Sequence, residues 1–146
     1  MIVGIGTDVV SIARIQGVLD RHGERFVNRV LTPDERTRFA KTKGKASHLA
    51  KRWAAKEAFA KAIGTGIHAP FTWQSISVGR DPRGKPLVIP GTEMAAHLRK
   101  MGVVSSHVSL TDDAGVAIAF VVLEGPPPQR SPTPRSTPWA PEGEGA

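Results

Sequence analysis

Cysteine and tyrosine are absent from this sequence, and aromatic residues make up only 5% of it. Without cysteine the chain can form no disulfide, no thiolate zinc site and no cysteine nucleophile. The longest apolar run, residues 116–123, is far shorter than the roughly 20 residues that a membrane-spanning helix needs. The opening Met-Ile-Val-Gly lacks the basic start of a signal peptide. These absences predict a cytoplasmic protein with no membrane partner.

The length of 146 residues suits one domain with a single buried core. The last 22 residues, 125–146, are different, because seven of them are proline and three are glycine. Such a segment has too few apolar side chains to offset the entropy that is lost on ordering. We therefore predict a folded domain over residues 1–124 and a disordered tail over residues 125–146.

Positive charge is concentrated in the first part of the chain. Residues 1–61 contain 13 lysines and arginines and 6 acidic residues, whereas residues 62–146 contain 7 of each. A basic surface attracts phosphates, nucleic acids or an acidic protein, and it can also be merely solvated. The charge alone does not distinguish these possibilities.

The first half of the chain predicts one strand followed by helices. Residues 2–6 form a short apolar run that is typical of a buried strand. A helix is expected from Ser11, with an interruption at His22-Gly23, and residues 32–35 carry the pattern of a capping box. We expect Ser47 to cap a long helix that runs through Ile63 and ends at the glycines of residues 64–66.

The second half predicts two hairpins with a helix between them. Strands at 75–78 and 86–89 flank a turn at 81–84, and strands at 107–111 and 115–123 flank a turn at 112–114. Residues 92–101 have a helical pattern. The expected fold class is α+β, with a mainly antiparallel sheet packed against the long helix.

Candidate chemistry begins on that long helix. Glu57 and Lys61 are four positions apart and therefore share one helix face. They can form a surface ion pair, or Glu57 can bind a hard cation or act as a general base while Lys61 holds a phosphate. Asp8, where the first strand ends, can cap a turn or supply a second carboxylate. Two carboxylates with water and substrate phosphates are a common Mg²⁺ site.

Two further features can bind an anion or play a structural part. The turn at Gly64-Thr65 can bring backbone N–H groups to a phosphate, although a helix C-cap also explains its glycines. His107 shares a strand face with Ser109 and Thr111, where it can be structural or donate to an anionic ligand.

The first predicted helix has a basic face. Arg14, Arg21 and Arg25 recur there with Val18 between them, provided that the helix continues past Gly23. Such a face is either solvated or suited to an acidic helix of a partner protein.

Four segments of residues 1–124 form an ordered set of motifs. The first is Gly4-Ile5-Gly6-Thr7-Asp8-Val9-Val10, and the second is the long segment 52–66, Arg-Trp-Ala-Ala-Lys-Glu-Ala-Phe-Ala-Lys-Ala-Ile-Gly-Thr-Gly. Gly84-Lys85-Pro86 and His107-Val108-Ser109-Leu110 are the third and fourth. This set resembles the holo-acyl-carrier-protein synthase family of 4′-phosphopantetheinyl transferases.

The resemblance implies a fold, a reaction and partners. The fold would be that of the 4′-phosphopantetheinyl transferases, typically a homotrimer with its sites between protomers. The reaction would move phosphopantetheine from coenzyme A to a serine of apo-acyl carrier protein, which releases adenosine 3′,5′-bisphosphate. Mg²⁺ would be required, and the product would serve fatty acid biosynthesis.

The resemblance also implies roles for individual residues. Asp8 and Glu57 would hold Mg²⁺, Glu57 would help to deprotonate the acceptor, and Lys61 would contact the phosphate. Coenzyme A would be bound by Arg52, Gly64, Thr65, Lys85, Pro86 and His107. The acidic helix of the carrier protein would meet Arg14, Val18, Arg21 and Arg25. Two positions depart from the family pattern, Ser11 in place of an acid and Trp53 in place of Phe.

Two other functions are compatible with parts of the sequence. A nucleic-acid-binding module would explain the basic half, but aromatic residues for base stacking are scarce and the paired acids would have no purpose. A phosphate-binding module without catalysis would use the same acidic and basic residues only to hold a ligand. We therefore expect a transferase and no nucleic-acid partner.

Overall fold

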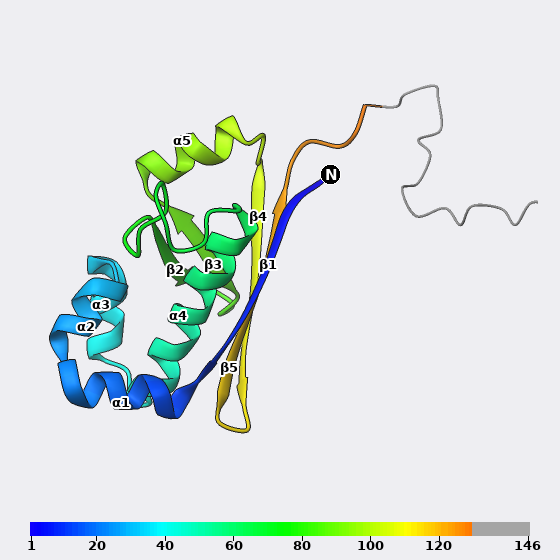
Figure 1. The fold of residues 1–146 in the computed structure, drawn as a ribbon. Helices are drawn as coiled ribbons and strands as arrows, with labels where there is room; N and C mark the ends of the chain where they lie inside the picture. The colour runs from blue at the N-terminus through cyan, green and yellow to red at the C-terminus, as the bar shows by residue number, and fades with distance from the viewer. Residues whose placement is uncertain (130–146) are drawn as a thin grey trace, which may run out of the picture.

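The computed structural model describes residues 1–129, so most of the predicted tail lies outside the described residues. The described chain is α+β, as predicted, and its elements follow one another in the order drawn in Figure 1. They are β1 (Ile2–Ser11), α1 (Ile12–His22), α2 (Glu24–Val30), α3 (Pro33–Ala40), α4 (Lys45–Ala62), β2 (Ile76–Arg80), β3 (Pro86–Pro90), α5 (Thr92–Lys100), β4 (Ser105–Asp113) and β5 (Val116–Glu124).

An antiparallel sheet and the long helix α4 make up the centre of the fold. The sheet has the order β1-β5-β4, and α4 packs across one of its faces (Figure 1). Every second residue of β5 points toward α4 and is completely buried, namely Ala117, Ala119, Val121 and Leu123. This arrangement confirms the expected packing of an antiparallel sheet against the long helix.

The opposite face of the sheet is apolar and exposed in the single chain. Ile5 and Val9 of β1 are 59% and 61% exposed, and Ile118 and Phe120 of β5 are 40% and 45% exposed. The expectation that residues 2–6 form a buried strand is therefore wrong for this face. The reason is that β1 alternates between two apolar faces, and α4 covers only one of them.

Local hydrogen bonds explain where the helices begin and end. The Ser11 hydroxyl accepts from the backbone N–H of Arg14 at 3.2 Å, and Thr32 and Glu35 form the predicted capping box. Gly23, with φ at 51°, ends α1 and separates it from α2, because this backbone conformation strongly favours glycine. The prediction for Ser47 is wrong, since α4 begins at Lys45 and Ser47 donates its hydroxyl proton to the carbonyl of Gly44.

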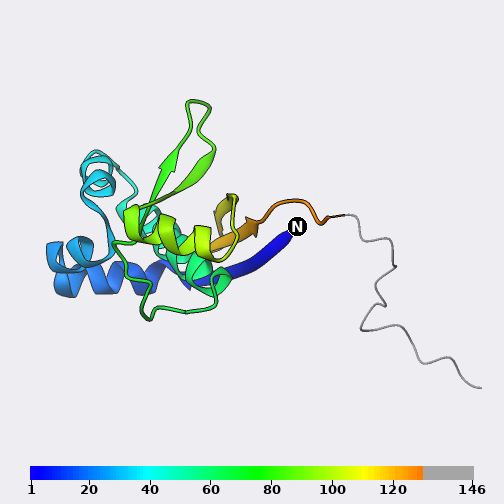
Figure 2. The same cartoon turned by 90° about the horizontal axis from the view of Figure 1, so that it is seen from above.

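The smaller sheet is the β2–β3 hairpin, which projects from the body of the molecule (Figure 2). Its turn lies at 81–84 as predicted, and the Asp81 carboxylate accepts from the N–H groups of Arg83 and Lys85. The second predicted turn is displaced, because β4 includes residues 112 and 113 and the turn lies at Ala114-Gly115. Both of these residues have positive φ, which is the geometry of a tight two-residue hairpin turn.

The two ends of the folded region lie side by side. The N-terminal ammonium donates to the carbonyl of Gly125 at 3.1 Å, and the N–H of Gly125 donates to the carbonyl of Met1 at 2.7 Å. Among residues 1–129, no helix is both long enough and apolar enough to span a membrane.

Candidate active site

The main chains of β1 and α4 touch at two glycines. A Cβ atom at Gly4 would lie 2.0 Å from the carbonyl oxygen of Ala62, and one at Gly6 would lie 1.8 Å from that of Ala58. No side chain fits into such a distance, so glycine is required for this helix to lie directly on the strand. Asp8, the next residue on the same strand face, is thereby brought against α4.

Asp8 meets a lysine of the helix at this contact. The Lys61 Nζ atom lies 3.2 Å from Asp8 Oδ1 and donates to the Thr7 carbonyl at 2.9 Å. The Asp8 side chain is only 15% exposed, whereas Lys61 is half-exposed. Glu57 precedes Lys61 by about one helical turn, so it shares the helix face that Asp8 approaches.

The charges of Asp8 and Lys61 both change the pKa of Glu57. Burial raises the pKa of Glu57 above its usual range, and the negative charge of Asp8 raises that pKa further. Lys61 and Arg14 act in the opposite direction and lower it. The structure therefore brings together the three residues that the sequence proposes for catalysis, Asp8, Glu57 and Lys61.

The donor atoms at this site suit a hard cation. The negative charge of Asp8 raises the pKa of Glu57, and a divalent cation between the two carboxylates would relieve this repulsion. Within residues 1–129, no group of three or more histidine and acidic side chains could hold a metal ion. Mg²⁺ fits such a pair, because it usually takes one or two carboxylates and completes its shell with water and substrate phosphates.

The turn after α4 uses its own N–H groups for the helix end. Gly64 donates to the Lys61 carbonyl, and the N–H groups of Thr65 and Gly66 both donate to the Ala60 carbonyl. Gly64 and Gly66 have φ of 82° and 60°, which explains why both are glycine. The geometry of this turn is thus that of a helix C-cap.

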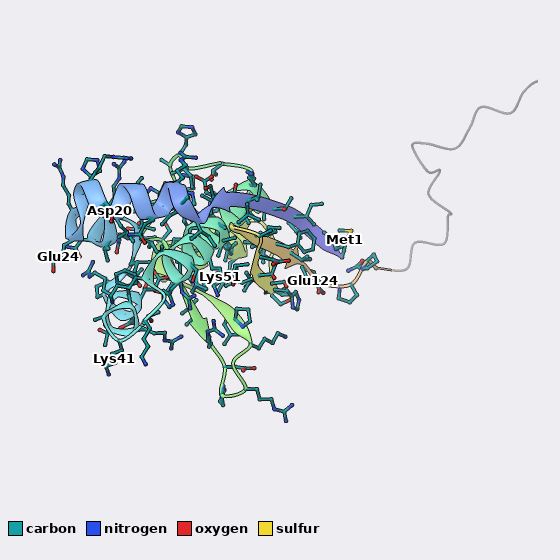
Figure 3. The ribbon with its side chains drawn as sticks, turned by 90° about the horizontal axis from the view of Figure 1, so that it is seen from below. Met1, Asp20, Glu24, Lys41, Lys51 and Glu124 are labelled. Atoms are coloured by element: carbon teal, nitrogen blue, oxygen red, sulfur yellow. The ribbon has the colours of Figure 1, made fainter. Side chains whose placement is uncertain are left out.

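The other residues expected to bind coenzyme A lie apart from Asp8 and Glu57. Lys85 and Pro86 belong to the projecting hairpin, which lies on the opposite side of the molecule from β1 (Figures 2 and 3). His107 lies on the exposed face of the sheet, where its Nε2 is 2.8 Å from Glu124 Oε1. One chain alone does not bring these three residues to the acidic pair.

Arg52 is buried rather than exposed. It is 1% exposed, and neither Nη1 nor Nη2 has a hydrogen-bond partner among the described residues. Burial, together with the charges of Arg80 and Arg38, lowers the pKa of Arg52 to about 10. His48, one turn earlier on α4, also has a buried nitrogen, Nε2, without a hydrogen-bond partner in residues 1–129. The negative charge of Glu35 acts in the opposite direction, but buried guanidinium nitrogens without hydrogen-bond partners are unfavourable, so this position suits an anion.

A basic and apolar groove runs between α1, α2 and α4. It has a volume of about 370 Å³, with Arg14, Arg25 and Arg29 at its edges and Ile15, Val18, Phe26 and Trp53 along its walls. Arg14, Arg21 and Arg25 do not lie on one continuous helix, because α1 ends at Gly23. Arg14, Val18 and Arg25 still line one groove, whereas Arg21 does not.

Sequence reasoning missed three residues near Glu57, two of which, Phe26 and Arg29, also line the groove. Phe26, Arg29 and Trp73 line a pocket of about 260 Å³ together with Trp53, Ile67 and Glu57. The Trp53 and Trp73 rings lie 4.3 Å apart. Phe26 and Arg29 would have been expected from a second amphipathic helix at 24–30, but Trp73 lies in a loop with no pattern to identify it.

Comparison with known proteins identifies the family of this chain. Residues 4–121 match the family described as the 4′-phosphopantetheinyl transferase superfamily. The holo-[acyl-carrier-protein] synthase of Aromatoleum aromaticum is 51% identical over 124 residues, which cover 85% of this chain and 98% of the relative. The enzyme of the same name from Thiobacillus denitrificans is 50% identical and is covered to 95%.

Solved structures agree with the sequence relatives. The holo-[acyl-carrier-protein] synthase of Neisseria meningitidis is similar with a TM-score of 0.82 at 42% identity, covering 85% of this chain and 99% of that one. The Helicobacter pylori synthase, solved in complex with coenzyme A, is similar with a TM-score of 0.73 at 34% identity, covering 82% and 99%. This chain therefore belongs to the 4′-phosphopantetheinyl transferase superfamily, in its holo-[acyl-carrier-protein] synthase family.

Proposed function

We propose that this protein transfers 4′-phosphopantetheine from coenzyme A to a serine of apo-acyl carrier protein. The other product is adenosine 3′,5′-bisphosphate. The observation that carries the proposal is the convergence of Asp8, Glu57 and Lys61 beside a groove lined by arginines. The absence of cysteine is compatible with the cytoplasm, where we place the reaction, and the holo-carrier protein would serve fatty acid biosynthesis.

The chemistry needs charge neutralisation more than a protein nucleophile. The serine oxygen forms a bond to the β-phosphorus of coenzyme A, and the bond from that phosphorus to the bridging pyrophosphate oxygen breaks. Glu57 accepts the serine proton directly or through water. Lys61 stabilises the negative charge that develops on the phosphoryl oxygens and donates a proton to the leaving phosphate.

Asp8 and Glu57 are the residues that would hold Mg²⁺. A bound Mg²⁺ would polarise the phosphoryl group and neutralise its charge. The other half of coenzyme A would be bound by Lys85, Pro86, His107, Arg52 and the turn at Gly64-Thr65. The buried Nη1 and Nη2 atoms of Arg52, which have no hydrogen-bond partner in the part of the chain that the structure describes, support an anion at that position.

The carrier protein would dock in the groove between α1 and α2. Its edges carry Arg14, Arg25 and Arg29, which suit acidic side chains of a partner helix, and Arg21 would extend the basic surface along α1. The walls, including Val18 and Phe26, provide the apolar contact that a buried interface centre needs.

We further propose that the active protein is a homotrimer with its sites between protomers. The exposed apolar sheet face at Ile5, Val9, Ile118 and Phe120 supports an interface between copies of this chain. A second copy could also bring His107 and the β2–β3 hairpin to the acidic pair, which one chain does not do.

Mass spectrometry tests the proposed function directly. Apo-acyl carrier protein is incubated with coenzyme A, Mg²⁺ and this protein, and the mass of the carrier protein is expected to rise by one phosphopantetheine. Reactions without enzyme, without coenzyme A and with the Glu57→Gln variant are the controls. Coenzyme A binding without any mass increase would instead favour a phosphate-binding module that lacks catalysis.

A further inference from the structure

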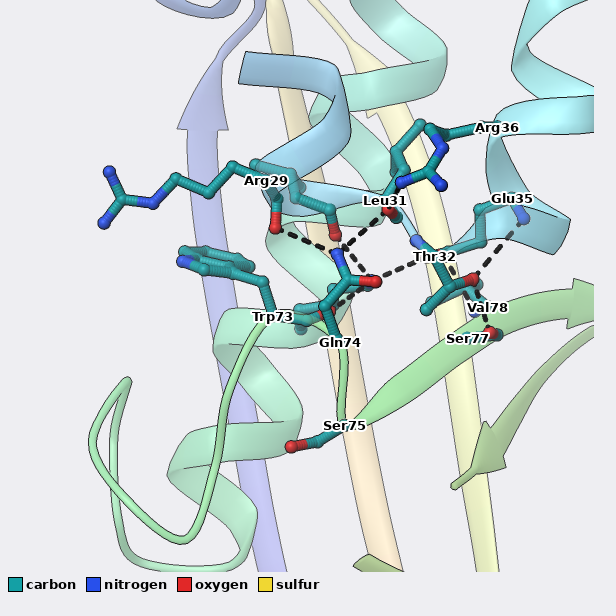
Figure 4. Close-up of polar contacts among 12 residues, drawn as sticks. Arg29, Leu31, Thr32, Glu35, Arg36, Trp73, Gln74, Ser75, Ser77 and Val78 are labelled. Atoms are coloured by element: carbon teal, nitrogen blue, oxygen red, sulfur yellow. Dashed lines mark hydrogen bonds and ion pairs between the residues drawn. The ribbon is translucent and has the colours of Figure 1, made fainter. Parts of the chain in front are cut away.

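The carboxyl end of α2 is held by side chains from other parts of the chain. Gln74 Nε2 donates to the carbonyl oxygens of Asn28, Arg29 and Leu31 at 3.2, 3.1 and 3.0 Å (Figure 4). Lys56 Nζ donates to the remaining carbonyl, that of Val30, at 2.7 Å. The last carbonyls of a helix have no partner within the helix itself. Arg36 Nη1 also donates to the carbonyls of Asn28 and Leu31, at 3.5 and 3.2 Å. Gln74, Lys56 and Arg36 therefore form a C-cap that is supplied from outside α2, in which Arg29 is bonded by Gln74 and Val30 by Lys56.

Lys56 is fixed in turn by a buried acid. Its Nζ lies 2.6 Å from Glu35 Oε1, and the two side chains are 0% and 2% exposed. Glu35 also accepts from the N–H of Thr32 and, through Oε2, from that of Val78 in β2. The third bond of Lys56 goes to the carbonyl of Trp73 at 2.7 Å. One ammonium thus joins α2, α3, α4 and the loop that carries Trp73.

The helix that is held in this way forms one wall of the docking groove. α2 has seven residues, which is too short for a helix to be stable without tertiary contacts. Arg25, Phe26 and Arg29 of α2 line the groove. Phe26 and Arg29 also line the pocket that contains Glu57. The position of α2 therefore sets where a docked carrier protein lies relative to Glu57.

We propose that Gln74, Lys56 and Glu35 are positioning residues for the carrier protein. They cap α2 and hold its groove-lining side chains against the helix that carries Glu57. None of the three lines the docking groove or the Glu57 pocket. This inference rests on the proposed docking of the carrier protein to α1 and α2.

Gln74 offers the sharper test, because its side chain lies at the surface and its loss leaves the core intact. Gln74→Met keeps the length of the side chain and removes its donors. We expect the KM for apo-carrier protein to rise about fivefold, which corresponds to about one lost hydrogen bond, while the KM for coenzyme A stays within about twofold. Hydrogen exchange of the backbone amides of α2 should become faster by a similar factor.

Gln16→Met is the matched control. Gln16 is also exposed and also donates from Nε2, but to Asp20 of its own helix at 2.8 Å. It borders a different groove, between α1, α2 and α3, and caps no part of α2. Both KM values and the exchange of α2 should remain those of the wild type. If the wild-type protein transfers phosphopantetheine normally, an unchanged carrier-protein KM in Gln74→Met would overturn the inference and leave the proposed function intact. Absence of wild-type transfer would instead contradict the proposed function.

The ion pair is tested by single and double replacement. Lys56→Met and Glu35→Leu each leave one buried charge without its partner, so both should unfold at lower temperature than the wild type. The double variant Glu35→Leu/Lys56→Met should recover much of that loss, because a buried ion pair can be replaced by apolar side chains. It still lacks the bond to the Val30 carbonyl, so its carrier-protein KM should stay raised.

The double variant separates a positioning role from a structural one. Recovery of both the melting temperature and the carrier-protein KM would show that the Glu35–Lys56 pair only stabilises the fold. Glu35 and Lys56 would then not be positioning residues. Failure of the double variant to fold would contradict the expected recovery. The Gln74 experiment then decides the role of the cap by itself.

Discussion

Lys61 and Asp8, 53 positions apart in the chain, form an ion pair with 3.2 Å between Nζ and Oδ1. The contact joins the long helix to the first strand, beside Glu57. Asp8 raises the pKa of Glu57 and Lys61 lowers it, so both partners of this ion pair lie close enough to Glu57 to act on its charge.

Neutralising either acid should abolish transfer without unfolding the protein. We expect Asp8→Asn and Glu57→Gln to lower kcat/KM for carrier-protein modification by ~100-fold or more, since each removes a proposed metal ligand. Their melting temperatures should not fall by more than a few degrees. Each change relieves repulsion between the two acids, and the ion pair that Asp8→Asn removes is partly exposed and therefore weak. Asp112→Asn is the control, as it removes a carboxylate that pairs with Lys51 at 3.0 Å. Wild-type turnover in either site variant would refute the assigned pair.

Reversing the charge of Arg25 should weaken docking specifically. In Arg25→Glu we expect the KM for the carrier protein to rise about tenfold, with little change in the KM for coenzyme A. Arg99→Glu makes the same change of charge on an exposed position of α5, outside the groove, and should behave like the wild type. Equal increases for both substrates would argue against this surface, and so would equal effects of the two variants.

A methyl group at Gly6 should destabilise the fold. The added Cβ of Gly6→Ala would meet the Ala58 carbonyl oxygen, so strand and helix must separate, at a cost of about 3 kcal/mol in the free energy of unfolding. Gly17→Ala is the control, because only the tip of the Arg21 side chain lies near that Cβ. It should raise stability by up to about 1 kcal/mol through helix propensity. Urea unfolding of the two variants would measure both effects, and equal stabilities would contradict the close contact.

His48 should make the protein sensitive to acid. Burial, and then the charges of Arg52, Lys51, Arg80 and Arg38, lower the pKa of His48 to about 4 from 6.5. The unfolded chain therefore binds the proton more readily between these values, and stability is lost as the pH falls through that window. From pH 7 to pH 5 this loss is about 2 kcal/mol. His48→Phe should lose correspondingly less, as measured by urea unfolding at both pH values. An identical pH dependence in the two proteins would contradict the shift.

Mixed oligomers can test whether sites lie between protomers. Asp8→Asn and His107→Ala should each be defective alone. Co-expression of the two variants should restore activity, because some interfaces then pair an intact Asp8 with an intact His107. If each site were complete within one chain, the mixture would only show the average of the two variants. Light scattering of the wild-type protein provides the oligomeric state independently.

Local patterns in the sequence predict most of the fold. The capping box at Thr32 and Glu35, the break at Gly23 and the turn at 81–84 all depend on neighbouring residues, and all are present. The errors arise where distant contacts decide. Residues 7–11 continue β1 because they pair with β5 from Phe120 back to Val116, and no local pattern of that segment shows its partner.

The candidate site was predictable in part for the same reason. Helical spacing places Glu57 and Lys61 on one face, whereas their meeting with Asp8 depends on the contact of β1 with α4. Gln74 and Trp73 could not be predicted, because they lie in a loop and their partners are more than 15 residues away. The resemblance assigns Arg52 to coenzyme A binding, but its burial could not be predicted, because it depends on the elements that pack on several sides of α4.

The glycine contact between β1 and α4 has a consequence for how the protein tolerates change. No side chain lies between the two backbones at residues 4 and 6. Substitutions that enlarge or shrink other core side chains therefore do not change the distance between the two backbones here, nor the distance of Asp8 from Glu57 and Lys61. Relatives could accordingly drift far in the composition of their interiors and still preserve the spacing of the reactive groups, provided that these two positions remain without a side chain.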